Sequence, residues 1–234
     1  MVYLEKAFHK HKLDYGSLSD FHPIQGSEVE IVSEETYQIN IEWVKNFALG
    51  VGIIPVFTNN ESDCVGVFSS SPLKGKIVLM NHGEADFTPR FSSISSFITQ
   101  INPIVGDWHN LPAEAFDYPI KDDFTIHQEL LLDCWKLIDQ NTFDSEEHRA
   151  LICQTAAFLT LPSALDTLLP FLKDRNPQIV DKVAWLLGVF HQYTPAQPLI
   201  ADLVKTRYKH HYLREHFYNG LFAKKRIWKK LFGK

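Results

Sequence analysis

The sequence lacks several features that would assign the chain to a specialised class of proteins. It has only 3 cysteines in 234 residues. Cys64, Cys134 and Cys153 are odd in number, widely separated and in no CxxC pair, which argues against a disulfide framework and against a cysteine zinc site. No apolar run reaches the roughly 18 residues of a membrane-spanning helix, and the first residues contain no apolar stretch of signal-peptide length. We therefore expect a cytoplasmic protein of ordinary globular composition.

Catalytic motifs are also missing from the sequence. It contains no glycine-rich phosphate loop, no GxSxG nucleophile elbow and no HExxH metal motif. Cys153 and His148 lie five positions apart on a predicted helix, so their side chains point about 140° apart and do not form a nucleophile and base pair. His82, Glu84 and Asp86 would permit a metal or acid–base cluster, but a solvated turn is the simpler interpretation. We predict no enzymatic activity, no catalytic or metal-binding residues and no cofactor.

The charge of the chain is unevenly distributed. Residues 1–140 hold 20 acidic and 9 basic side chains, a net charge of −11, and residues 141–204 hold 7 and 4, a net charge of −3. Residues 205–234 hold 1 acidic and 10 basic side chains, a net charge of +9. An acidic body followed by a basic end indicates either two kinds of partner or an internal electrostatic contact.

Residues 1–102 have the pattern of an α+β domain. Apolar spacing predicts helices over 34–49 and 91–101. Between them, runs rich in Val, Ile and Phe are separated by turn-forming residues, which predicts three antiparallel strands within 50–60, 64–70 and 75–83.

Residues 103–123 contain three prolines and little periodicity, which is typical of a linker. Residues 124–220 are helical in pattern. Asp144 and Glu147 resemble a capping box, and Asn176-Pro177 and Thr194-Pro195 are typical helix starts. Helix starts recur about every 31 to 33 residues, which predicts a stack of helix pairs of the HEAT type.

The segment from Ile53 to Ile101 resembles the SUKH superfamily, the group of Smi/Knr-like proteins. The resemblance is carried by Ile54-Pro55 in a strand, Ser62-Asp63 in a turn, Gly75-Lys76-Ile77-Val78 after a loop and Ser96-Phe97 in a helix. The first 30 residues lack the N-terminal signature of the superfamily.

The resemblance implies an α+β fold with a curved antiparallel sheet and packed helices. It also implies a bacterial immunity protein, which binds and neutralises a toxin without catalytic residues of its own, whereas fungal relatives act in cell-wall-assembly signalling. The predicted HEAT-like extension looks like material found among immunity and adaptor proteins, by analogy of fold alone.

The acidic body supplies the candidate residues for partner binding. Toxins that act on nucleic acids are commonly basic, so an acidic surface would attract such a toxin and occupy its phosphate-binding cleft. Asp107-Trp108-His109 forms either a partner patch or a segment anchored by a buried Trp. The candidate partner-binding residues are Glu61, Asp63, Glu84, Asp86, Asp107 and Trp108.

The last 14 residues, 221–234, form a basic amphipathic pattern. Such a helix either lies on an anionic membrane, contacts nucleic acid, or closes the helical stack with its lysines in solvent. We favour the closing helix and expect no direct contact with nucleic acid, and we keep a scaffold or peripheral membrane adaptor as the alternative function. The residues of this basic tail are Lys224, Lys225, Arg226, Trp228, Lys229 and Lys230.

Overall fold

A computed structural model describes residues 2–47, 52–81, 86–121 and 125–206. Contacts divide the chain into two compact units. The first consists of Met1–Pro119 and His127–Thr155, and the second of Ile120–Ile126 and the chain from Ala156 onward.

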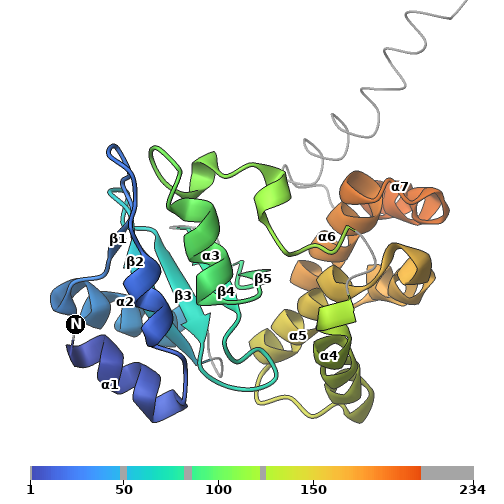
Figure 1. Ribbon diagram of the computed structural model, residues 1–234. Helices are drawn as coiled ribbons and strands as arrows, with labels where there is room; N and C mark the ends of the chain where they lie inside the picture. Colours follow the sequence, from blue (N-terminus) through green and yellow to red (C-terminus); the bar gives the residue numbers. More distant parts are fainter. Residues whose placement is uncertain (1, 48–51, 82–85, 122–124, 207–234) are drawn as a thin grey trace, which may run out of the picture. The chain divides into compact units, whose positions relative to one another are not determined.

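The first unit is built on a five-stranded antiparallel sheet with the order β1-β2-β3-β4-β5 (Figure 1). The three predicted strands are confirmed as its centre, where Ile54 pairs with Val67 and Gly66 pairs with Val78. The two outer strands were not predicted, because runs of two and three residues carry no readable alternation. The bounds are β1 Glu30–Ile31, β2 Ile53–Thr58, β3 Cys64–Phe68, β4 Ile77–Met80 and β5 Pro89–Phe91.

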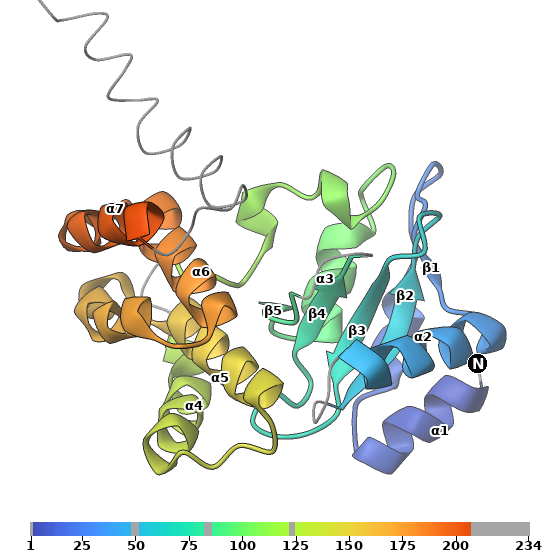
Figure 2. The same ribbon diagram turned by 180° about the vertical axis from the view of Figure 1, so that it is seen from behind.

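Helices cover both faces of this sheet. Helix α2 (Glu34–Phe47) lies on one face, and α3 (Ile94–Ile101) lies on the other (Figures 1 and 2). Every residue of β2 and β3 is buried, because both faces of these strands are covered. Helix α1 (Val2–His11), which was not predicted, adds Leu4 and Phe8 to the same core as α3.

Helix α3 shows how local sequence fixes an element of this core. Ser93 caps its N-terminus by accepting a hydrogen bond from the backbone N–H of Ser96 at 3.1 Å. The predicted apolar stripe is buried, but the helix begins later than expected because Phe91 pairs with Ile77 in the sheet. The buried residues of α3 are Ile94, Phe97, Ile98 and Ile101.

Residues 103–119, which the sequence indicates as a linker, belong to the first unit and contribute to its core. They form two short 3-10 turns, η2 (Trp108–Asn110) and η3 (Ala113–Ala115). The backbone N–H of Glu28 donates to the carbonyl of Gly106 at 2.7 Å and ties this segment to the residues before β1. Trp108, Leu111 and Ala115 are buried in the core.

The predicted helices that follow the sheet are present, with one different cap. Helix α4 (Gln128–Gln140) follows the 3-10 turn η4 (Thr125–His127), and α5 spans Glu146–Leu159. The Oγ of Ser145 accepts from the backbone N–H of His148 at 3.0 Å, so Ser145 caps α5 where the sequence suggests Asp144. The chain therefore enters this helix one residue later than the capping-box pattern indicates.

The described part of the second unit is helical. Asn176 caps α6 as predicted, by accepting from the backbone N–H of Gln178 at 2.9 Å. Thr194 and Pro195 open a 3-10 turn rather than the helix itself. The elements are η5 Pro162–Lys173, α6 Pro177–Trp185, a π-helical segment Leu186–Phe190, η7 Thr194–Ala196 and α7 Gln197–Thr206.

None of the described helices is both long and apolar enough to cross a lipid bilayer. The predicted basic tail, including Lys224 and Trp228, lies outside the described residues.

We predict that Phe97→Ala destabilises the protein by about 3–5 kcal/mol, because a fully buried aromatic ring is replaced by a cavity. The measurement is urea unfolding followed by circular dichroism. Thr99→Ala, at an exposed position of the same helix, is the matched control and should change stability by less than about 0.5 kcal/mol. Equal losses from both substitutions would contradict the assigned core.

Candidate functional site

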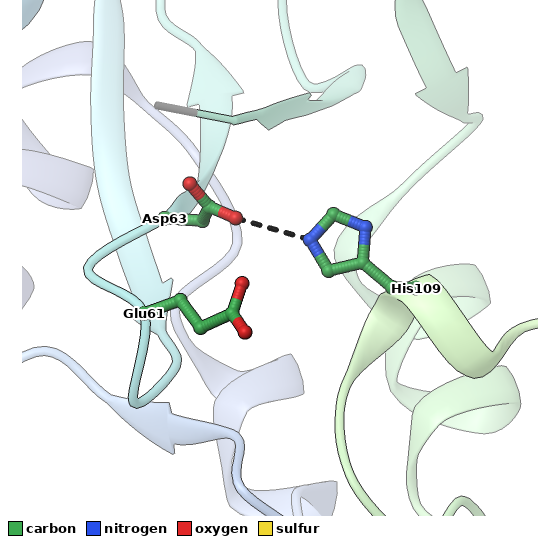
Figure 3. Close-up of side chains that lie close together, drawn as sticks. All are labelled: Glu61, Asp63 and His109. Atoms are coloured by element: carbon green, nitrogen blue, oxygen red, sulfur yellow. Dashed lines mark hydrogen bonds and ion pairs between the residues drawn. The ribbon is translucent and has the colours of Figure 1, made fainter. Parts of the chain in front are cut away.

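The candidate site lies where two loops of the first unit meet. The turn between β2 and β3, residues 59–63, faces the segment 105–110, which contains η2 (Figure 3). Four of the six predicted partner-binding residues, Glu61, Asp63, Asp107 and Trp108, come from these two loops.

Asn59 organises the site with its side-chain amide. Its Oδ1 accepts hydrogen bonds from the backbone N–H groups of Glu61 at 3.0 Å and Asp63 at 2.9 Å. Its Nδ2 donates to Oδ2 of Asp107 at 2.5 Å. Asn59 is only 6% exposed, and its bonds to Asp63 and Asp107 are buried, so one side chain holds both loops in position.

Asp107 fixes the second loop. Its other carboxylate oxygen, Oδ1, accepts from the backbone N–H of His109 at 2.8 Å and so caps the η2 turn. Asp107 is buried, and a buried carboxylate is tolerated when charged and polar donors satisfy it. The position of the His109 backbone therefore depends on Asp107, which in turn depends on Asn59.

His109 and Asp63 connect the two loops directly. The Nε2 atom of His109 lies 3.0 Å from Oδ2 of Asp63. The Asp63 side chain is buried, whereas 42% of the His109 side chain is exposed. Burial acts to lower the pKa of His109, but the hydrogen bond to Asp63 and the charges of Asp107, Asp63 and Glu61 outweigh it and raise the pKa.

Glu61 completes a group of three possible metal ligands. It is exposed in the β2–β3 turn, and one donor atom from each of Glu61, Asp63 and His109 lies within 4.8 Å of the other two. A set of two carboxylates and one imidazole can either form an ion pair within the protein or bind a cation. In the sequence, His109 belongs to the possible partner patch Asp107-Trp108-His109 without a role of its own, and no motif singles out Asn59.

The remaining predicted residues lie elsewhere or outside the description. Trp108 is 1% exposed, so it anchors the loop in the core and does not present a contact surface. Asp86 accepts hydrogen bonds from Thr88 and Arg90 just before and within β5. Glu84 and His82 fall outside the described residues.

A groove of about 700 Å³ lies between α1, α2 and the start of β2. It is lined by Tyr3 and Tyr37, whose ring centroids are 5.3 Å apart, and by Lys6 and Lys10. Of the predicted site residues that the structure describes, none lines this groove. Helix α1, which forms one wall, was not predicted.

A separate pair of polar residues, Tyr118 and His127, is buried in the first unit. The Oη of Tyr118 and Nδ1 of His127 are 3.0 Å apart, and both residues are buried. Burial, together with the positive charge of Lys76, lowers the pKa of His127 to about 4, against the opposing influence of Asp117. His127 is therefore neutral in the folded protein at neutral pH.

Comparisons with protein-family models, with curated proteins and with solved structures find no match to this chain.

We predict that Asn59→Ala destabilises the protein by about 2–3 kcal/mol, because it removes three hydrogen bonds, two of them buried, and leaves Asp107 short of a donor. Asn60→Ala, at the exposed neighbouring position, is the control and should stay within about 0.5 kcal/mol of the wild type. Chemical denaturation measures both. A similar loss for the two variants would show that Asn59 does not organise the loops.

We predict that His127 makes the protein less stable in acid. Its folded pKa of about 4 lies below its ordinary value of 6.5, so the unfolded chain binds more protons between these values and stability falls as the pH drops from 6.5 to 4. His127→Gln should reduce this loss by on the order of 2 kcal/mol. Unfolding measured across this pH range tests it, with His22→Gln at an exposed position as the control. An unchanged pH slope in His127→Gln would contradict the assignment.

Proposed function

We propose that the protein is a non-enzymatic binding protein that neutralises a toxin by direct contact, as an immunity protein does. The observation that carries the proposal is an acidic edge at one end of the sheet. This acidic edge consists of Glu28 before β1, Glu30 in β1 and Glu61 in the β2–β3 turn, all of them exposed.

Hydrogen bonds and strand pairing bring these three residues into neighbouring segments. The backbone of Glu28 is bonded to Gly106, which precedes Asp107. Glu30 pairs with Thr58, which precedes Asn59 and the turn that carries Glu61. Glu28 and Glu30 therefore lie in segments bonded next to the two loops that Asn59 holds, and Glu61 lies in one of these loops.

The acidic edge suits a basic partner. Residues 1–119 hold 15 acidic and 7 basic side chains, a net charge of −8. Three of these seven bases, Lys6, Lys10 and Lys12, lie in or directly after α1 rather than at the acidic edge. A field of this kind accelerates association with a basic protein and competes with phosphate groups for its binding cleft. A toxin that acts on nucleic acid has such a cleft. Since its target lies inside the cell, the proposed action takes place in the cytoplasm.

We further propose that the N-terminal unit is SUKH-like. The residues that carry the resemblance occupy ordered positions: Ile54-Pro55 is in β2, Ser62-Asp63 is in the following turn, Ile77-Val78 begins β4, and Ser96-Phe97 is in α3. A HEAT-like arrangement of the helical region is part of the same proposal. It is supported by the Pro-initiated helix α6 and by the largely buried residues from Ile179 to Gly188.

We predict that reversing the acidic edge abolishes protection. The variant Glu28→Lys/Glu30→Lys/Glu61→Lys should lose co-purification with a toxin encoded by a neighbouring gene and should no longer rescue growth, because attraction becomes repulsion. The matched control reverses three other exposed acids, Glu5→Lys/Glu35→Lys/Glu42→Lys, and should retain both properties.

The assays of the wild-type protein test the immunity function, and the assays of the two triple variants test which surface binds the toxin. If the wild type neither binds nor protects, the immunity function is wrong. If both triple variants lose binding to the same extent, net charge matters but the acidic edge is not the contact surface.

A further inference from the structure

We propose that Glu61, Asp63 and His109 form a binding site for a divalent transition-metal ion of the zinc class. The three side chains come from two loops and converge in front of the β2–β3 turn (Figure 3). The inference concerns these residues alone and does not rest on the proposed immunity function.

The spacing of the donor atoms suits a small ion. In a tetrahedral site with bonds of about 2.0–2.1 Å, neighbouring ligand atoms lie about 3.3 Å apart. The Nε2 of His109 and Oδ2 of Asp63 are already 3.0 Å apart. The carboxylate of Glu61 lies within 4.8 Å of both partners, and its exposed side chain can rotate to close the remaining distance.

The donor types select the class of metal. An imidazole nitrogen with two carboxylates is a common ligand combination for zinc and its neighbours, whereas calcium and magnesium prefer oxygen ligands alone. Three protein ligands leave a fourth position for water. Because Glu61 and His109 are exposed, an ion can reach the site from solvent.

Asp63 distinguishes this group from an ordinary patch of surface acids. Asp63 is 5% exposed, and a buried carboxylate needs compensating positive charge or hydrogen bonds. A bound cation would place a positive charge directly beside this buried carboxylate. Ion binding would therefore replace the contact between Asp63 and His109 with two metal–ligand bonds.

The surrounding residues hold the ligands in place. Asn59 binds the backbone of Glu61 and Asp63, and Asp107 binds the backbone of His109. Asn59 also bonds to Asp107, so the two ligand-bearing loops share one support. Such outer contacts commonly tune metal affinity by fixing the positions of the ligands.

The test is calorimetric titration of the full-length, tag-free protein with ZnCl₂ after treatment with EDTA. We expect the wild type to bind one zinc ion. In His109→Ala and in Glu61→Gln the affinity for zinc should fall at least about tenfold or be lost, since each variant removes a ligand. Glu61 is exposed, so Glu61→Gln keeps the test valid if His109→Ala fails to fold. Circular dichroism of the metal-free variants checks the fold.

Control variants separate this site from other zinc-binding groups on a chain with 11 histidines. His22→Ala and Glu114→Gln, both at exposed positions, should bind zinc as the wild type does. The proposal is overturned if the wild type takes up no zinc, if either folded ligand variant binds within about tenfold of the wild type, or if the controls lose affinity equally. Each of these results is independent of whether the protein binds a toxin.

Discussion

The candidate site depends on the side-chain amide of Asn59. An amide offers an acceptor and two donors, and here Oδ1 binds the backbone of the β2–β3 turn while Nδ2 binds Asp107. Neither Asp nor Leu could replace it. A carboxylate at this position would have no donor for Asp107 and would place a second negative charge beside it, and an apolar side chain would leave all three groups unsatisfied. The geometry of Glu61, Asp63 and His109 follows from this one residue.

The site brings acidic groups together at an energetic cost. Asp63 and Asp107 are both buried, and buried carboxylates seldom stabilise a fold relative to apolar residues of similar size. Their hydrogen bonds offset the loss of hydration without making the arrangement favourable in itself. The hydrophobic core of the first unit supplies the stability that allows this arrangement. Trp108 belongs to that core and anchors the same loop with a fully buried ring. A loop that is held by hydrogen bonds to a buried carboxylate and anchored by an aromatic ring is better suited to presenting ligands than to stabilising the fold.

The sequence predicts the regular elements better than it predicts the site. The central strands are readable because Val, Ile and Phe cluster between turn residues, and α3 is readable from its apolar stripe. The prolines in 103–123 indicate a linker, but proline content carries no information about burial, and Trp108 is in the core. The approach of Asp63 to His109 joins residues 46 positions apart through two irregular loops. Local patterns contain no information on such contacts, so the acidic residues could be named while their arrangement could not.

The two proposals for this region share Glu61, which belongs both to the acidic edge and to the group of possible metal ligands, and this couples them thermodynamically. A divalent cation held by Glu61, Asp63 and His109 would reduce the negative potential of the acidic edge and weaken its attraction for a basic partner. Linkage then requires that the bound partner lower the affinity for the cation by the same factor, because one coupling free energy describes the effect of each ligand on the other. If the partner instead supplied the fourth ligand, the sign would reverse and each would strengthen the other. The coupling therefore arises because Glu61 belongs to both sites, and its sign depends on whether the partner supplies a ligand to the ion.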